Sequence, residues 1–174
     1  KPIEGTIARG QYNENASLLT GKNEDGSYLL NNPIELSAEV LDRGEDRFDI
    51  YCSVCHSQVG NGKGIVTQYD YPVIPANLHD QRIREQADGE MYNTIVYGLR
   101  SMPAYGYQIN TDDVWSIVHY VRALQRSQNA TIEDLPENEQ IDLEDLNLDD
   151  DAAQDLLDSL DGLFGGFPDL LNGQ

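Results

Sequence analysis

Two cysteines and a histidine stand within five residues of one another, in the segment Cys52-Ser53-Val54-Cys55-His56. Two thiols at this spacing near a helix end can each add to one vinyl group of a haem, and the next residue then places its imidazole below the iron. A redox-active cysteine pair would follow a strand–helix pattern, which the surrounding sequence lacks, and a zinc site would need a fourth strong ligand. The segment therefore predicts covalent attachment of haem c.

An iron atom bound by His56 needs a sixth ligand from elsewhere in the chain. The candidates are Met91, Met102, His79 and His119. We favour Met102, because it lies in a loop rich in glycine and aromatic residues and the rigid Pro103 can hold its sulfur in place. We expect Met91 to fill a gap in the core and His119 to lie at a helix edge, while His79 stays open as an alternative. Methionine opposite histidine raises the reduction potential and closes the iron to substrates, which favours electron transfer over peroxidase or oxygen chemistry.

Caps and turn residues predict the elements that lead to this segment and away from it. Ser37 is expected to cap a helix over residues 38–51, which ends just before the first cysteine. Residues 57–79 contain the turn cluster Gly60-Asn61-Gly62-Lys63-Gly64 and are expected to form loops. Short helices are expected at 80–85 and at 90–97.

The longest predicted helix follows the methionine loop. Thr111 is expected to cap it, and its body should cover residues 112–126, with aspartates at its start and arginines at its end as the helix dipole prefers. Asp88 and Gly98 are expected to bound the preceding helix. The apolar stripe of the long helix consists of Val114, Ile117, Val118, Val121 and Leu124. Helical spacing of these residues predicts one buried face.

Charge is distributed unevenly along the 174 residues. Residues 127–174 contain fourteen Asp or Glu and no Lys or Arg, so the net charge of −20 divides into −6 before this block and −14 within it. A chain this acidic is not expected to bind nucleic acid, and it should repel anionic membrane surfaces and attract basic partners. No segment is apolar for long enough to span a bilayer.

Composition divides the chain into an extended arm over residues 1–36, a folded domain over 37–128 and an acidic tail over 129–174. The tail has one periodic segment, residues 150–163, which predicts an amphipathic helix with nothing nearby in the sequence to cover it. The tail is either disordered, as its composition suggests, or held by a partner subunit, which we favour. The chain starts at Lys1 without a methionine, which we interpret as a processed start that is compatible with a preceding lipid anchor.

With these features in place, residues 44–126 resemble a class I cytochrome c. The resemblance implies an all-α fold in which the N- and C-terminal helices cross around one haem. The absence of a side chain at Gly44, one turn before Phe48, permits the close approach of a second helix. In the family an aromatic residue of the last helix packs on this glycine, and here Ile117 and Tyr120 occupy the matching places.

The resemblance also implies roles for residues around the haem. The family uses a loop proline carbonyl to accept the N–H of the axial histidine, and Pro75 matches that place, with Pro72 as the alternative. Arg100 is expected to pair with a haem propionate, the alternative being an exposed loop arginine. The aromatic residues expected to wall the haem are Tyr105, Tyr107 and Trp115, the alternative being ordinary packing in the core.

A closer resemblance covers residues 5–128 and points to the mono-haem cytochrome c subunit of bacterial alternative complex III. It rests on Ile7-Ala8-Arg9-Gly10, Asp25-Gly26-Ser27-Tyr28, the segment from Arg43 to Cys52, the glycine cluster at 60–64 and Ala123-Leu124-Gln125-Arg126-Ser127-Gln128. It implies an electron carrier that is not an enzyme by itself, at the periplasmic face of the inner membrane. Its partners would be the other subunits of a quinol-oxidising complex and a periplasmic carrier or terminal oxidase. The alternatives are a free periplasmic shuttle and an enzyme with an open haem.

Overall fold

A computed structural model of the chain describes residue 6, residues 15–69 and 72–131, and residue 134. The chain divides into two units, Lys1–Asn129 and Ala130–Gln174, and nearly all described residues belong to the first. The amphipathic helix predicted at 150–163 lies outside the described residues. Within the described ranges, no helix combines the length and the apolar character that crossing a bilayer requires.

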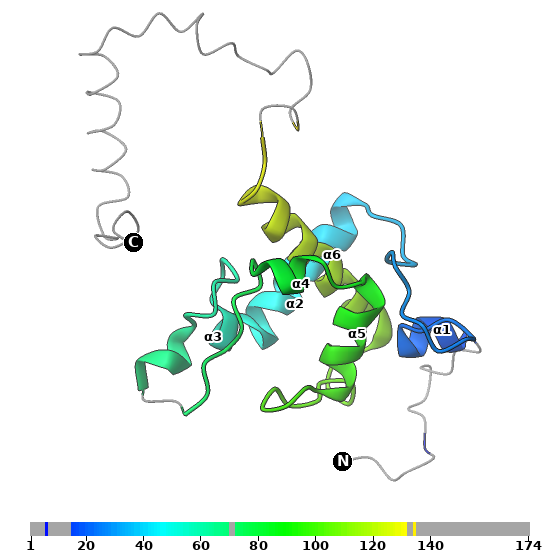
Figure 1. The fold of residues 1–174 in the computed structure, drawn as a ribbon, viewed down its shortest axis with the longest axis horizontal. Helices are drawn as coiled ribbons and strands as arrows, with labels where there is room; N and C mark the ends of the chain where they lie inside the picture. Colours follow the sequence, from blue (N-terminus) through cyan, green and yellow to red (C-terminus); the bar gives the residue numbers. More distant parts are fainter. Residues whose placement is uncertain (1–5, 7–14, 70–71, 132–133, 135–174) are drawn as a thin grey trace, which may run out of the picture. The chain divides into compact units, whose positions relative to one another are not determined.

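The described part of the first unit is built from helices (Figure 1). Its elements are α1 (Ala16–Thr20), α2 (Ala38–Tyr51), α3 (Ser53–His56), the 3-10 helix η1 (Ile65–Tyr69), α4 (Gln81–Arg84), α5 (Asp88–Tyr97) and α6 (Thr111–Ser127). Extended pairing among the described residues is limited to the isolated bridges Lys22–Tyr28 and Leu99–Met102. The predicted all-α fold is confirmed.

The two longest helices begin at polar caps. The Ser37 hydroxyl accepts a hydrogen bond from the Val40 N–H at 3.3 Å, as the sequence predicts. At α6 the cap is Asn110 instead of the expected Thr111, because Asn110 keeps an extended backbone and its side-chain oxygen accepts from the Asp113 N–H at 2.9 Å. Thr111 is already helical. Satisfying these first N–H groups fixes where each helix starts.

Helices α2 and α6 cross in contact with one another (Figure 1). A Cβ placed on Gly44 would lie 2.1 Å from the Ser116 carbonyl oxygen and 2.9 Å from Cβ of Tyr120. A bidentate ion pair joins the same two helices, with the Arg43 guanidinium donating to the Asp113 carboxylate at 2.6 and 2.8 Å. The close approach predicted from Gly44 is therefore present, and its main partner is the α6 backbone.

The core lies where α2, α5 and α6 meet. Tyr92 and Trp115 stack within it, with ring centroids 4.2 Å apart and ring planes 18° apart. Met91 is 6% exposed and belongs to this core, as expected from the sequence. The remaining buried members of the cluster are Phe48, Ile95, Ile109, Val114, Ile117, Val118 and Val121.

The described end of the predicted arm, residues 15–36, packs on α5 and α6. It contains α1, which the sequence did not predict, and its backbone and side chains bond to the helices at several points. The Trp115 indole N–H donates to the Leu18 carbonyl at 2.9 Å, and the Asn32 amide donates to the Trp115 carbonyl at 2.9 Å. His119 Nε2 lies 2.8 Å from the carbonyl oxygen of Ile34. This segment is therefore part of the folded body.

Arg122 of α6 holds the connection between α4 and α5. Its Nε donates to the Asp88 carboxylate at 2.7 Å, and its Nη1 donates to the Arg84 carbonyl at 2.9 Å. A further bond runs to the Gln86 carbonyl. Asp88 is the first residue of α5, with Ala87 as the cap, so its carboxylate serves this ion pair and does not cap the helix from outside as predicted.

Candidate functional site

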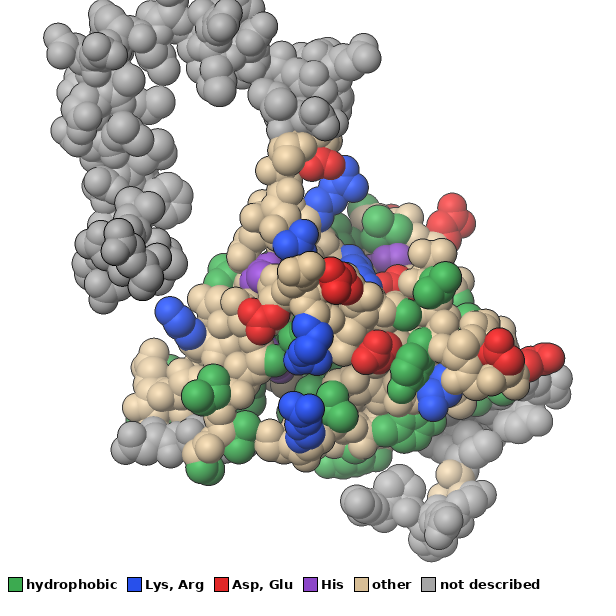
Figure 2. Space-filling model, viewed as in Figure 1, with side chains coloured by type: hydrophobic (Ala, Val, Ile, Leu, Met, Phe, Trp, Pro, Cys, Tyr) green, Lys and Arg blue, Asp and Glu red, His purple; other side chains and the backbone are tan. Residues whose placement is uncertain are grey.

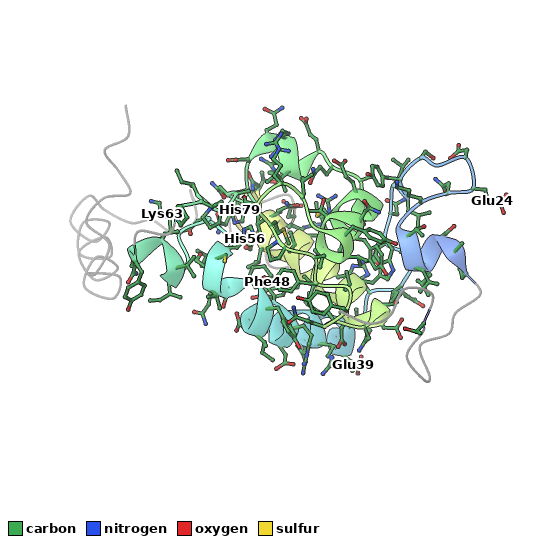
Figure 3. All side chains as sticks on the ribbon, turned by 90° about the horizontal axis from the view of Figure 1, so that it is seen from below. Glu24, Glu39, Phe48, His56, Lys63 and His79 are labelled. Atoms are coloured by element: carbon green, nitrogen blue, oxygen red, sulfur yellow. The ribbon has the colours of Figure 1, made fainter. Side chains whose placement is uncertain are left out.

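One cavity of about 300 Å³ gathers most of the residues singled out from the sequence. This volume falls in the range of small-molecule and cofactor pockets. Figure 3 shows His56 and Phe48 near the middle of the body, whereas Glu24, Glu39 and Lys63 project at its periphery. The cavity lining includes Cys52, Cys55, His56, Pro75, Ala76, Met91, Arg100, Met102 and Tyr105, with apolar side chains from α2, α4, α5 and α6.

The two cysteines and His56 are positioned by a continuous run of helix. Cys52 ends α2 and caps α3: its N–H donates to the Phe48 carbonyl at 2.8 Å, and its carbonyl accepts from the His56 N–H at 2.9 Å. Burial raises the pKa of the Cys52 thiol to about 12, with smaller contributions from Cys55 and Asp49. Before haem is attached, this thiol is therefore protonated at neutral pH.

The hydrogen bond of His56 determines which ring nitrogen can bind a metal. Its Nδ1 lies 2.9 Å from the Ala76 carbonyl oxygen. A carbonyl only accepts hydrogen bonds, so Nδ1 carries the proton and Nε2 keeps its lone pair. Burial lowers the pKa of His56, and the hydrogen bond to Ala76 opposes this effect only in part. The lowered pKa favours the neutral imidazole that binding to a metal requires.

This bond corrects the prediction for Pro75. The Pro75 carbonyl oxygen faces Gly62, where an added Cβ would lie 2.6 Å from it, and the next carbonyl along the chain, that of Ala76, reaches the imidazole. Gly62 has φ +77°. The glycine turn thus packs against the 75–76 loop, and it is also tied to the cysteine segment, because Gly64 N–H donates to the Cys55 carbonyl at 3.0 Å.

Met102 reaches the cavity from a tight turn. Its N–H donates to the Leu99 carbonyl at 2.9 Å, and its carbonyl accepts from the Leu99 N–H at 3.1 Å. Met91 lines the same cavity from α5, so two thioethers are present. The two histidines weighed as ligands lie outside the lining: His79 Nε2 is 2.7 Å from the Val59 carbonyl, and His119 is bonded to the arm.

One of the three aromatic residues expected around the haem lines the cavity. Tyr105 lines the cavity and meets Tyr51 edge-on, with centroids 6.4 Å apart. Tyr107 is 55% exposed, and Trp115 is turned toward Tyr92 in the core, so neither walls the cavity. Sequence reasoning also missed Arg82, which lines the cavity from α4. The short helix was predicted, but nothing in its residue types showed that it would face the site.

The segment that builds this cavity matches a known family. The family described as cytochrome c oxidase, cbb3-type, subunit III matches residues 39–121. Residues 39–121 belong to the c-type cytochromes. The match covers the cysteine–histidine segment, the methionine turn, nearly all of α2 and the part of α6 up to residue 121. The fold is accordingly that of a class I cytochrome c.

Relatives of this cytochrome carry related names. It is 27% identical over 122 residues to the cytochrome bc1 complex cytochrome c subunit of Corynebacterium efficiens, covering 67% of this chain and 35% of that protein. It is 26% identical over 112 residues to cytochrome c6 of Gracilaria tenuistipitata var. liui, covering 59% of this chain and 89% of that protein. Among solved structures, cytochrome cL of Methylophaga aminisulfidivorans matches with a TM-score of 0.48 and 21% identity, covering 77% of this chain and 89% of that one. The chain thus spans about a third of the corynebacterial relative.

The cofactor of this cytochrome is covalently bound haem c. The cavity fits it on chemical grounds, because two thiols, an imidazole with a free Nε2 and a thioether line a largely apolar space. Soft sulfur and imidazole ligands are those that haem iron takes in cytochromes c. The cytochrome therefore transfers electrons.

Proposed function

We propose that Cys52 and Cys55 hold the haem through thioether bonds and that His56 Nε2 and the Met102 sulfur are its axial ligands. When bound, the haem supplies a one-electron Fe(III)/Fe(II) couple. The observation that carries the proposal is that all four side chains line one cavity. The Ala76 carbonyl orients His56, and the Leu99–Met102 turn holds the sulfur, so that the chain keeps both ligands in place in either redox state.

The ligand assignment is tested by comparing the two cavity methionines. Met102→Ala should remove the weak long-wavelength band that reports sulfur ligation in the oxidised protein. Its midpoint potential should fall by the order of 0.1–0.3 V, within the roughly 0.8 V range that axial ligands span. It should also bind added cyanide or imidazole at the open position. The measurements are absorption spectroscopy and a redox titration.

Met91→Leu is the matched control, because it removes the other sulfur from the cavity while conserving volume. It should keep the band and most of the midpoint potential. Loss of the band in Met91→Leu, with retention in Met102→Ala, would reverse the assignment. Retention in both variants would move the sixth ligand to a residue outside the cavity.

We further propose that the cytochrome is the electron-carrying subunit of a membrane-bound, quinol-oxidising complex, on the extracytoplasmic side. Its composition supports fixed contacts over repeated docking through lysines, because only Lys1, Lys22 and Lys63 are present. Large apolar side chains at the cavity mouth suit a neighbour of complementary apolar surface, since Ile74 is 91% exposed and Leu99 is 50% exposed. The name of the corynebacterial relative, a subunit of a bc1 complex, agrees with this role.

The alternative is a free shuttle, and one observation favours it. The match to cytochrome c6 spans 89% of that protein, so a domain of this kind can make up almost an entire chain. Tagged cytochrome isolated from gently solubilised membranes of its native host separates the two. Co-purification with other subunits and quinol-dependent reduction of the haem are expected. Recovery of the cytochrome alone in the soluble extract would support the shuttle.

The role of the acidic tail, residues 129–174, can be tested by the same co-purification from solubilised membranes. We propose that it contributes to assembly by binding a partner subunit, so deletion of residues 131–174 should leave the haem spectrum unchanged and lower the recovery of the complex. An intact complex from the truncated strain would rule out this role for the tail.

A further inference from the structure

A buried glutamine of α6 bonds to the loop that orients His56. Gln125 is 5% exposed, whereas the charged side chains on the face in view in Figure 2 lie at the surface of the body. Its Nε2 donates to the Leu78 carbonyl at 2.7 Å. A buried amide that lost this acceptor would be destabilising, so the bond holds Leu78 against α6.

The backbone of Leu78 is held on both sides. Its N–H donates to the Gly60 carbonyl at 2.8 Å, and its carbonyl is the acceptor for Gln125. The Val59 carbonyl, next to Gly60, accepts from the Gln128 amide at 3.1 Å. Two glutamines at the C-terminal end of α6 therefore fasten both of these loop segments to the same helix.

The carbonyl that bonds to His56 Nδ1 belongs to Ala76, two residues before Leu78. Residues 72–76 form no backbone–backbone hydrogen bond with another described residue, and Ile74 among them is 91% exposed. Leu78 is the first residue after them whose backbone bonds to a distant part of the chain. The position of the Ala76 carbonyl therefore depends on how firmly Leu78 is held.

The orientation of the Gln125 amide is set by Arg122, one turn earlier on α6. Arg122 Nη1 donates to the amide oxygen at 2.9 Å, which leaves the amide N–H groups for Leu78. Since an arginine only donates and a carbonyl only accepts, one orientation of the amide satisfies both partners. Arg122 is itself paired with Asp88, which also accepts from the Asn32 N–H at 2.8 Å. The glutamine therefore stands in a fixed polar network.

We propose that Gln125 is a positioning residue for the axial histidine. Through its bond to Leu78 it holds the Ala76 carbonyl where the Nδ1–H of His56 can donate to it. The inference rests on the proposed haem site and goes beyond it, since Gln125 does not line the cavity. A carbonyl that accepts from Nδ1–H makes the imidazole a stronger electron donor, which favours Fe(III) over Fe(II). Loosening the loop should weaken that bond and raise the reduction potential.

The test compares Gln125→Met with Ser116→Ala in the haem-loaded cytochrome. Methionine has a volume similar to that of glutamine and removes both hydrogen bonds of the amide. Ser116 is 4% exposed on the same helix, and its hydroxyl donates to the Asp112 carbonyl at 2.9 Å. Ser116→Ala therefore removes a buried hydrogen bond within α6 and leaves the loop untouched.

The first readout is the exchange of the His56 Nδ1 proton with solvent in the reduced, diamagnetic protein, followed by NMR. Exchange should be at least about tenfold faster in Gln125→Met, because loss of the bond to Leu78 makes local opening easier. In Ser116→Ala it should stay within about threefold of the wild-type rate. The second readout is the midpoint potential at pH 7, which should rise in Gln125→Met and stay at the wild-type value in Ser116→Ala.

Gln125→Glu separates the two bonds of the amide. A carboxylate beside Arg122 still accepts from it but has no N–H to donate to Leu78. Exchange of the His56 proton should therefore be faster in this variant too, and the variant replaces Gln125→Met if that one does not accumulate. The exchange rate is the readout here, because the added negative charge acts on the potential by itself.

Wild-type exchange and potential in Gln125→Met, with a lowered free energy of unfolding, would show that the glutamine only supports the fold and would overturn the proposal. A potential that falls in Gln125→Met would contradict it as well. Faster exchange in Gln125→Met but not in Gln125→Glu would assign the effect to the bond from Arg122 and overturn the role of Leu78. A wild-type protein without covalent haem would refute the proposed site, and the positioning role with it, before any variant is compared.

Discussion

Replacing both Cys52 and Cys55 by alanine should leave a protein without covalently attached haem. No other cysteine exists in the chain, so no thiol remains to form a thioether. Haem retained only by His56 and Met102 would dissociate under denaturing conditions. The measurement is haem-dependent peroxidase staining on a denaturing gel, with intact-protein mass as a second readout. We expect complete loss of the stain and of the haem mass.

Replacing each cysteine singly, and replacing the residue between them as a control, tests this prediction further. Cys52→Ala and Cys55→Ala each keep one thiol, so stable holoprotein should be reduced and any remaining haem attached through one bond. Val54→Ala is the matched control, because Val54 lies between the cysteines, is 42% exposed and carries no reactive group. It should retain normal haem content. Normal covalent haem in the purified double variant would refute the attachment site.

Local signals predicted the parts of the site that depend on neighbours in sequence. The bounds of α2 follow from Ser37 as cap and from the break at Cys52, and both signals act within one turn of the helix. The cysteine segment carries its chemistry in five consecutive residues. Gly98 ends α5 as predicted, since its φ of +78° is one that few other residues adopt.

Contacts between distant segments could not be predicted in this way. The sequence predicted that the carbonyl of Pro75 would reach His56, but the carbonyl of the next residue, Ala76, does so. The Pro75 carbonyl packs against Gly62 instead, and this contact between distant segments cannot be read from the local sequence. Arg82 lines the cavity from α4, and the carbonyl of Arg84 at the end of that helix accepts a hydrogen bond from Arg122, some forty residues later in the chain. Trp115 points away from the site because Leu18 and Tyr92 surround it. Each of these outcomes depends on tertiary packing and not on local pattern.

Gly44→Ala should destabilise the holoprotein strongly, although alanine is the better helix former. In an isolated helix, replacing glycine by alanine would stabilise the helix by about 1 kcal/mol. Here the new methyl would lie 2.1 Å from the Ser116 carbonyl oxygen and 2.8 Å from its carbonyl carbon. Both atoms belong to the backbone, so no side-chain rotation relieves the clash and α2 and α6 must separate. We expect a net loss of at least about 2 kcal/mol in the free energy of unfolding, at the upper end of overpacking costs.

Guanidinium unfolding of the haem-loaded protein, followed by absorbance, measures this loss, and Asp42→Ala is the control. Asp42 is exposed on the same helix, so its replacement should change stability by no more than about 0.5 kcal/mol. The clash should also reach the site, because Phe48 on α2 and Ile117 and Val121 on α6 line the cavity. The sulfur-ligation band should therefore weaken in the folded fraction of Gly44→Ala. Wild-type stability in that variant would mean that the two helices do not approach as closely as the structure describes, and that something other than their crossing determines the width of the haem cavity.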